Sequence, residues 1–274
     1  MALFTVDEKK CRRDGLCVAE CPAKIIEIVG KEGFPTPLDG AEELCINCGH
    51  CVSICPHEAL ALKTMSPKDC LPIRKELLLS PEHCEHFLRF RRSIRSYKEK
   101  RVSRDLLQKL IELARYAPTG HNSQSAHWLI IEDQTEVKRM GGLVADWMRS
   151  LIAEKVEFAL SMHMDRVVDS WDKGIDRILR SAPHLIVAHG LSTMPLSQSS
   201  CFIALTYLEL IAPSLGLGTC WAGYFTAAAN FYPPLQKALD LPQGHLPYGA
   251  TMIGYPTYRY QRMPPRNKPE ISWR

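Results

Sequence analysis

Two short runs near the N-terminus of this 274-residue chain place seven cysteines and one aspartate at spacings that suit iron–sulfur chemistry. The second run has the spacing Cys-x2-Cys-x2-Cys-x3-Cys-Pro and consists of Cys45, Cys48, Cys51 and Cys55. In the first run the same offsets are occupied by Cys11, Asp14, Cys17 and Cys21. In such runs three closely spaced thiolates hold one cluster, and the fourth cysteine binds the other cluster. The two runs therefore predict two iron–sulfur centres.

The crossover of the fourth cysteine predicts which residues share a cluster. A complete 4Fe–4S cluster is expected on Cys21, Cys45, Cys48 and Cys51. The other cluster is expected on Cys11, Cys17 and Cys55, with Asp14 facing its fourth iron. A carboxylate is a harder ligand than a thiolate, so two outcomes stay open: an Asp-ligated 4Fe–4S cluster with a labile corner, or a 3Fe–4S cluster with Asp14 unligated. Asp14-Gly15 could also be a simple turn dipeptide.

Two other uses of closely spaced cysteines fit the pattern less well. Structural zinc sites prefer separated Cys-x2-Cys pairs that feed one tetrahedral ion. A disulfide framework suits a small secreted domain, whereas the first ten residues, MALFTVDEKK, lack the apolar region of a secretory signal. Eleven cysteines without such a signal favour a reducing, cytoplasmic setting. The four cysteines outside the runs are expected to be small buried hydrophobes: Cys70, Cys84, Cys201 and Cys220.

The overall composition excludes some classes of partner. The chain is 46% hydrophobic and 23% charged, which suits one large or two modest globular domains. A net charge of +4, with no basic run interleaved with aromatic residues, does not favour nucleic acid. The longest apolar stretch, about 201–212, is too short and too polar to span a membrane.

Residues 1–64 resemble a bacterial two-cluster ferredoxin, which is built from two pseudo-symmetric units. The resemblance rests on the two cysteine runs and on the similar segments that follow each Cys-Pro, at 23–29 and 58–63, where a turn should lead into a short edge strand. Residues 65–80 contain two prolines and are interpreted as a linker. The second domain is then expected over residues 81–274.

The second domain alternates helical and strand patterns, which predicts an α+β or α/β sandwich. Ser80-Pro81-Glu82 is typical of a helix start, and that helix should end near Arg91. A second helix should follow Ser103, with Leu106, Leu110 and Leu113 as its apolar stripe. Strands are expected at 127–132, 184–189 and 250–255, and helices at 135–164, 170–180 and 199–214. The last of these is apolar on most sides, as in a helix buried in a core or a subunit interface.

Four separated motifs carry a second resemblance. An arginine-rich segment at 91–95 could be a solvated surface, although guanidinium groups beside a serine also suit a phosphate monoester. A turn rich in amide side chains follows at 117–124, then the segment 215–224, and finally a basic segment after Ile253-Gly254-Tyr255-Pro256. In this order they resemble the FMN-dependent nitroreductase family over about residues 84–274. The resemblance implies an α+β sandwich that forms an intertwined homodimer, with FMN bound at the interface by both chains.

The resemblance also implies flavin contacts. The phosphate and ribityl ligands would be Arg91, Arg92, Ser93 and Arg95, with Arg262 as a late phosphate ligand and Arg259 as a helper. The turn that contacts the flavin would comprise Pro118, Thr119, Asn122 and Gln124. The segment lining the ring would comprise Cys220, Trp221, Ala222 and Gly223. The sequence departs from the family after Gln124, where Ser125-Ala126 stands in place of Pro-Trp. His121, His127, Cys220 and Tyr224 are expected near the flavin as packing or hydrogen-bonding groups.

These expectations combine into one functional hypothesis with an alternative. An iron–sulfur centre moves single electrons and FMN can deliver two, so an external low-potential donor would reduce the clusters, and FMN would reduce a nitroaromatic, a quinone or an activated alkene. The flavin does the chemistry, and no catalytic acid or base is expected. No Gly-x-Gly-x-x-Gly follows a strand, but NAD(P)H could still reduce the flavin directly. The alternative is an electron carrier or redox sensor without its own turnover. An open cleft formed by 135–180, near Trp147, Met148, Met162, Met164 and Trp171, would favour the enzyme.

Overall fold

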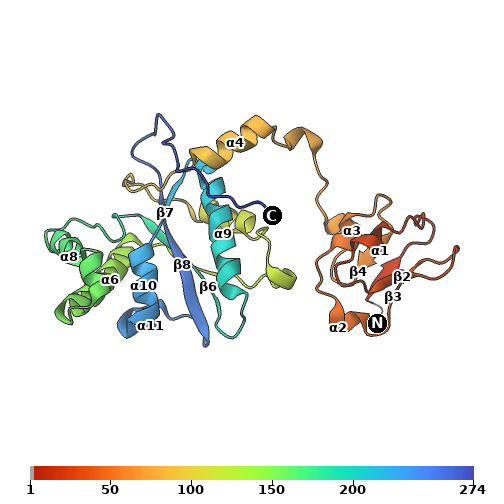
Figure 1. Ribbon diagram of the computed structural model, residues 1–274, viewed down its shortest axis with the longest axis horizontal. Helices are drawn as coiled ribbons and strands as arrows, with labels where there is room; N and C mark the ends of the chain where they lie inside the picture. The colour runs from red at the N-terminus through yellow and green to blue at the C-terminus, as the bar shows by residue number, and fades with distance from the viewer. Residues whose placement is uncertain (1–2) are drawn as a thin grey trace. The chain divides into compact units, whose positions relative to one another are not determined.

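The computed structural model describes residues 3–274, which form two compact units. The first unit extends to Leu78 and also includes Gly120–Ser123. The second comprises Leu79–Thr119 and Gln124–Arg274. Both units carry helices and strands (Figure 1), so the mixed class expected from the sequence is confirmed.

Two small antiparallel sheets frame the first unit. In one, β1 (Phe4–Val6) pairs with β4 (Leu60–Leu62), and in the other β2 (Ile26–Ile28) pairs with β3 (Pro35–Pro37). β2 and β4 are the strands predicted after each Cys-Pro, whereas β1 and β3 were not predicted. The helices of this unit are α1 (Leu16–Glu20), α2 (Ala41–Leu44) and α3 (His50–Ser53).

Glycines with positive φ precede the helices of both cysteine runs. Gly15 before α1 has φ 74°, and Gly49 before α3 has φ 72°. Glycine adopts this left-handed conformation without the steric cost that a side chain brings. The reversal turns Cys17 and Cys51 into the interior, where both are buried. The two runs thus have the same local architecture, in agreement with their equal spacing.

The chain that follows β4 is mostly irregular as far as residue 80. It contains the short 3-10 helices η1 (Pro67–Asp69) and η2 (Lys75–Leu77), followed by α4 (Pro81–Phe90). Ser80 caps α4 as predicted, because its Oγ accepts a hydrogen bond from the backbone N–H of His83 at 3.3 Å.

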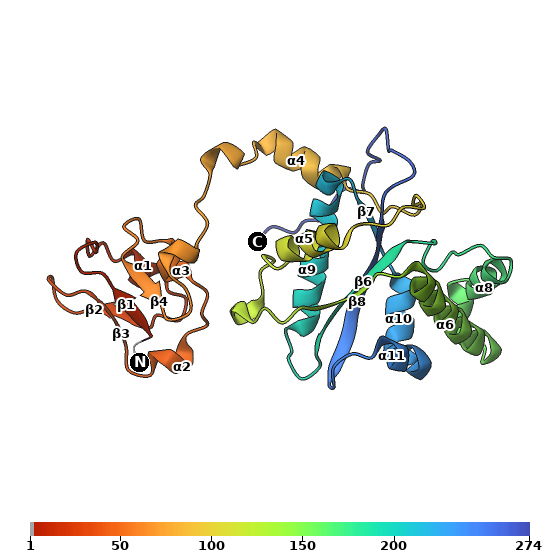
Figure 2. The same cartoon turned by 180° about the vertical axis from the view of Figure 1, so that it is seen from behind.

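A four-stranded antiparallel sheet forms the centre of the second unit, in the order β5-β6-β8-β7. Its strands are β5 (His127–Ile131), β6 (His184–Leu191), β7 (Gly218–Trp221) and β8 (His245–Gly254). Helices cover both faces (Figures 1 and 2). One face packs against α5 (Arg104–Ala114) and α9 (Ser197–Ile211). The other packs against α6 (Gln134–Ala153), α8 (Met164–Asp172), α10 (Gly223–Phe231) and α11 (Pro233–Leu239).

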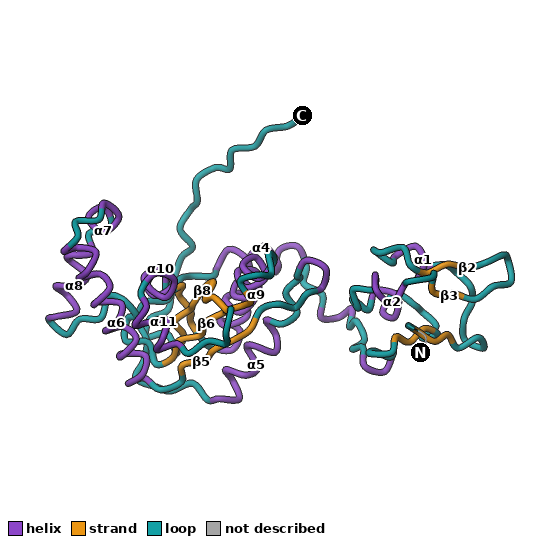
Figure 3. Tube along the Cα trace, turned by 90° about the horizontal axis from the view of Figure 1, so that it is seen from below, coloured by secondary structure: helices purple, strands orange, loops and turns teal. Residues whose placement is uncertain are grey.

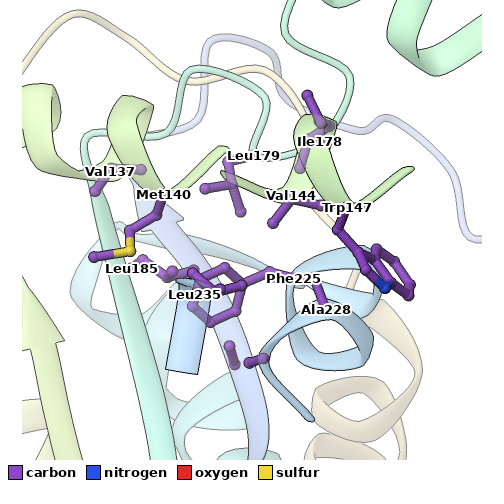
Figure 4. Close-up of a cluster of buried hydrophobic side chains, with 14 of the residues drawn as sticks. Val137, Met140, Val144, Trp147, Ile178, Leu179, Leu185, Phe225, Ala228 and Leu235 are labelled. Atoms are coloured by element: carbon purple, nitrogen blue, oxygen red, sulfur yellow. The ribbon is translucent and has the colours of Figure 1, made fainter. Parts of the chain in front are cut away.

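Side chains of β6 alternate between these two faces, as a strand requires. Leu185 and Val187 belong to the core beneath α6 and α10, whereas Ile186 packs with α5 and α9. Figure 4 shows the larger core, where Phe225 of α10 lies beside Leu185. The remaining short helices are α7 (Glu157–Ser161), η3 (Gly120–Asn122) and η4 (Ala212–Leu215). Figure 3 shows the chain after β8 as loop up to its C-terminal end.

Three expectations from the sequence are wrong, concerning one helix, the buried face of another and the burial of one cysteine. The helix expected over 170–180 is absent from its second half, because α8 ends at Asp172 and Gly174 takes φ 80°. In α5 the buried stripe is Leu107, Leu110 and Ala114 rather than one including Leu113, because both sets satisfy a helical period and packing selects one. Cys84 is exposed rather than buried. The helix near 199–214 and the three predicted strands are present.

Candidate functional site

One cavity in the first unit is lined by all four cysteines predicted to share a complete cluster. Cys21, Cys45, Cys48 and Cys51 surround an empty volume of about 380 Å³, together with apolar groups such as Phe4. Burial, followed by the neighbouring thiols of Cys48, Cys21 and Cys45, raises the pKa of Cys51 to about 11. The second run therefore contributes three thiols and the first run contributes one, as the crossover requires.

A second cavity is lined by the other four residues. Cys11, Asp14, Cys17 and Cys55 surround an empty volume of about 330 Å³. Burial raises the pKa of Cys17, and the nearby thiols of Cys11 and Cys55 raise it further. Asp14 also makes local contacts: its Oδ1 accepts from the backbone N–H of Leu16 at 3.2 Å, and its Oδ2 lies 3.9 Å from His57 Nε2.

The donor sets of both cavities fit iron–sulfur clusters. A buried thiol resists ionisation when nothing compensates the negative charge, which is why the pKa values of Cys17 and Cys51 are raised. Metal ions invert this preference, since a coordinating thiol is deprotonated outright. Soft thiolates grouped in an apolar shell are the ligands that iron–sulfur clusters use.

In the second unit, the arginine-rich segment lies against β7. Ser93 forms an isolated parallel bridge with Thr219, and the backbone N–H of Ile94 donates to Thr219 O at 2.8 Å. The approach is close enough that a Cβ on Gly218 would meet Ile94 Cγ1 at 2.5 Å. Two motifs more than 100 residues apart are thereby joined, and the glycine before Thr219 permits the contact.

Arg91 is held by a buried acid that the sequence analysis did not single out. Arg91 Nη1 donates to Glu209 Oε1 at 3.0 Å, while Trp221 Nε1 donates to Glu209 Oε2 at 3.2 Å. Glu209 is buried on α9. In the sequence, Glu209 is the single acid within the apolar stretch near 201–212. Because a buried carboxylate is normally paired, this acid could have been predicted to bind a cation. Glu209 thus links two of the expected flavin segments.

Arg92 lines a basic pocket. Arg89, Arg91, Arg92 and Arg266 border an empty volume of about 1040 Å³, with Leu88, Met263 and two prolines as the apolar part of its lining. Within residues 3–274, Arg92 Nε is buried and has no hydrogen-bond partner. A buried, unpartnered guanidinium nitrogen in a cationic pocket fits an anionic ligand such as a phosphate. Arg262 and Arg259 are exposed and do not line this pocket, whereas Arg266 does.

The segment expected to line a flavin ring joins β7 to α10. Cys220 and Ala222 are buried, and Gly223 is the first residue of α10. Burial raises the pKa of Cys220, while Arg95 and Arg180 oppose that shift. A Cβ built on Gly223 would meet no atom within 4 Å, so there is open space beside the start of the helix. A planar ring can approach the backbone at such a position.

The amide-rich turn is divided between the two units. Pro118, Thr119 and Gln124 belong to the second unit, where the Gln124 backbone N–H donates to Thr119 Oγ1 at 3.0 Å. Asn122 is grouped with the first unit, and its Nδ2 donates to the backbone carbonyls of Ile46 and Asn47 at 3.3 and 2.9 Å. Asn122 and Gln124 both have positive φ. The turn therefore has an unusual backbone, in the place where the sequence departs from the family pattern.

The aromatic and methionine residues of the 135–180 region mostly fill the core. Trp147, Met148 and Met164 are buried in the cluster beneath α6, whereas Met162 is exposed. Trp171 lines a pocket with an empty volume of about 1310 Å³, whose lining includes none of the expected flavin contacts. No helix within residues 3–274 combines the length and apolar character needed to cross a membrane.

Comparison with known families assigns both parts of the chain. Residues 88–255 match the model described as "Nitroreductase family". The chain belongs to the nitroreductase family. Residues 9–60 match the model described as "4Fe-4S dicluster domain", so this nitroreductase carries an N-terminal dicluster domain, and the fusion expected from the sequence is confirmed.

The chain is also similar to individual proteins. An iodotyrosine deiodinase from Thermotoga neapolitana is 28% identical over 129 residues, covering 47% of this chain and 67% of that protein. The FMN reductase [NAD(P)H] of Bacillus subtilis is 27% identical over 176 residues, covering 63% of this chain and 66% of that protein. A nitroreductase with bound FMN from Desulfitobacterium hafniense superposes with a TM-score of 0.56 at 22% identity, covering 71% of this chain and 99% of that chain. The second unit therefore has the nitroreductase fold.

Proposed function

We propose that this chain is an iron–sulfur flavoprotein oxidoreductase, in which electrons from an external donor pass through two clusters to FMN and then to a small acceptor. The sorting of the cluster ligands supports this most directly. Each of two cavities is lined by one complete crossover set, in the same chain as a nitroreductase domain. A dicluster domain handles single electrons and has no use for a small substrate of its own, so its fusion to a reductase favours electron supply.

The cluster ligands are assigned by cavity. The first cavity would hold a 4Fe–4S cluster on Cys21, Cys45, Cys48 and Cys51. The second would hold either an Asp-ligated 4Fe–4S or a 3Fe–4S cluster on Cys11, Asp14, Cys17 and Cys55. Bound clusters would supply one-electron transfer, and the chain supplies the buried thiols and the apolar shell around them.

FMN is the flavin that the second unit fits best. Bound FMN would accept electrons singly and deliver a hydride equivalent. The Arg92 and Arg266 guanidinium groups would bind its phosphate, since both line the basic pocket and Arg92 Nε is unpartnered. Arg91, fixed by Glu209, and the Ser93–Arg95 segment would orient the ribityl chain. The open space beside Gly223 would accept the ring. The Desulfitobacterium hafniense neighbour contains FMN.

A homodimer fits the exposed face of α9. Phe202, Ile203 and Tyr207 are apolar or aromatic and remain partly exposed on this helix. In the family that the sequence resembles, the flavin site is completed by both chains, so we expect the second copy to cover this face. The proposed acceptor is a nitroaromatic, a quinone or an activated alkene, and the proposed donor is a low-potential protein or NAD(P)H in a cytoplasmic setting.

The test is an anaerobic turnover assay on the full chain with a panel of nitro, quinone and enone acceptors, supplied with a reduced low-potential donor or with NAD(P)H. We expect acceptor-dependent oxidation of the donor. If no acceptor is reduced although the clusters and the flavin are, the chain is an electron carrier.

Analysis of the released cofactor accompanies the assay. The released flavin should be FMN, and recovery of FAD would contradict the proposal that the basic pocket binds the FMN phosphate.

FMN retention can be tested at Arg92 with a matched control. Replacing Arg92 by Ala removes a guanidinium whose Nε is buried and unpartnered, and it should weaken FMN binding by about tenfold or more, since charge-assisted hydrogen bonds contribute about 1.5–3 kcal/mol. Arg115→Ala removes an exposed arginine near Tyr116 and should leave FMN binding unchanged. Equal FMN affinity of the two variants would place the phosphate elsewhere.

A further inference from the structure

Three histidines meet at one end of the large sheet. His127 begins β5, His189 lies near the end of β6, and His245 begins β8. His127 and His189 are direct partners across β5 and β6, while His245 pairs with Leu191, two residues beyond His189. Directly paired residues share a face of a sheet, and so do residues two apart on one strand. The strand register therefore gathers three imidazoles that are widely separated in sequence.

The rings are close enough to share a ligand. His189 Nδ1 lies 3.0 Å from His245 Nδ1. The ring centroids are 5.7 Å apart for His127 and His189, 4.9 Å for His127 and His245, and 5.1 Å for His189 and His245. Two neutral imidazoles whose Nδ1 atoms face each other can hold only one proton between them, so one of these nitrogens offers a lone pair to the other.

These separations match a three-histidine metal site. With a metal–nitrogen distance of about 2.0–2.1 Å and tetrahedral angles, each ring centre lies about 3.2 Å from the ion, so two ring centres lie about 5.2 Å apart. The three observed separations lie on either side of that value. A metal ion between the two facing Nδ1 atoms would replace their shared proton, as ligation requires deprotonated nitrogens.

The surroundings of the central ring disfavour a positive charge on it. His189 is buried beside the rings of His127 and His245, and burial disfavours the charged form of an imidazole. The neutral imidazole is the form that binds metals. His127 is exposed and His245 half-buried, so an ion could reach the site from solvent.

We propose that His127, His189 and His245 bind a divalent transition-metal ion, Zn²⁺ being the best match, with a fourth position left to water. Within residues 3–274 no three His, Cys, Asp or Glu side chains are arranged to hold a single metal ion as they stand, so binding would turn the exposed His127 ring toward the Nδ1 pair. Imidazole suits zinc, copper and nickel. The bound ion would tie β5, β6 and β8 together at one end of the sheet. None of the three histidines lines the two cluster cavities or the basic pocket, and His127, which the sequence placed near the flavin as a packing or hydrogen-bonding group, would ligate the ion instead.

Zinc titration of the full chain, loaded with clusters and flavin under anaerobic conditions, tests the site. Calorimetry should show one Zn²⁺ per chain. X-ray absorption at the zinc edge should show nitrogen and oxygen neighbours at about 2.0–2.1 Å. His127→Gln and His245→Gln should each weaken binding by about tenfold or more, because each removes one of three ligands. His83→Gln, an exposed histidine on α4, is the matched control and should bind like the parent.

Two results would overturn this site. Sulfur neighbours at about 2.3 Å would show that the zinc sits on cysteines instead. An unchanged zinc affinity in His127→Gln would show that the three rings do not act together. His127 is exposed, so this variant is expected to fold and the test does not depend on replacing the buried His189.

Discussion

The buried carboxylate of Glu209 gives the sharpest test of how the arginine segment is held. In Glu209→Gln the side chain keeps its shape and can still accept from Trp221 Nε1, but the charge facing Arg91 disappears. Removing one partner of a fully buried ion pair costs about 3–5 kcal/mol, and exposed pairs contribute at most about 1 kcal/mol. The Arg91 side chain is 24% exposed and that of Glu209 is 8% exposed. We therefore expect a loss of about 2 kcal/mol, between these limits.

Tryptophan fluorescence can follow this loss in the second unit alone, because all five tryptophans lie between residues 128 and 273. A change of about 2 kcal/mol should lower the melting temperature by about 4–8 °C for a domain of this size. Glu112→Gln, at an exposed position on α5, is the control and should change stability by no more than about 0.5 kcal/mol. Repeating the melt at a tenfold higher FMN concentration separates altered stability from altered flavin binding.

A double-mutant cycle decides whether Arg91 is the cause. In an Arg91→Met background, Glu209 would be a buried acid without its cation, so Glu209→Gln should there be neutral or stabilising. If Glu209→Gln costs the same with and without Arg91, or no more than Glu112→Gln does, the two charges do not stabilise the second unit as a pair.

Three further predictions concern other parts of the chain. Replacing Asp14 by Cys should raise the iron content of the second cluster and give it the EPR signature of a four-iron centre; an unchanged signal would mean that Asp14 does not face that iron. His184 is buried and neutral, and burial lowers its pKa. The unfolded state therefore binds this proton more readily, and the free energy of unfolding should fall as pH drops below about 6.5. The melting temperature should depend less steeply on pH in His184→Gln than in the parent. Gly218→Ala should lower the free energy of unfolding by about 1–3 kcal/mol, because the new Cβ would clash with Ile94. In the control Gly142→Ala the new Cβ meets its nearest atom at 3.7 Å, so this variant should be neutral or stabilising. Equal melting temperatures of the two variants would contradict the close approach of Ile94 to Gly218.

The sequence predicted most where local spacing decides the structure. The cluster sets follow from offsets within two runs, and the cavities of the first unit are lined by those sets. The capped start of α4 and the apolar strands β5, β6 and β8 were likewise predicted from the sequence. β7 was missed because its four residues are stabilised by pairing with β8 rather than by a pattern of their own.

Residues brought together by tertiary structure were harder to foresee. Arg266 lines the basic pocket, whereas Arg262, which was expected as a phosphate ligand, does not line it, since the chain after β8 has no periodic element that could fix its course. Glu209 can bind Arg91 and Trp221 only because α9 packs beside β7 and the arginine segment. The three histidines are adjacent only through strand register.

Anaerobic rapid mixing can show whether electrons reach the flavin through the clusters. The parent and a Cys48→Ala variant that retains FMN are each mixed with a reduced low-potential donor, and flavin reduction is followed. We expect rapid flavin reduction in the parent and reduction slowed by an order of magnitude or more in Cys48→Ala. Equal rates of flavin reduction in the two proteins would show that electrons reach the flavin without passing through the cluster that Cys48 holds.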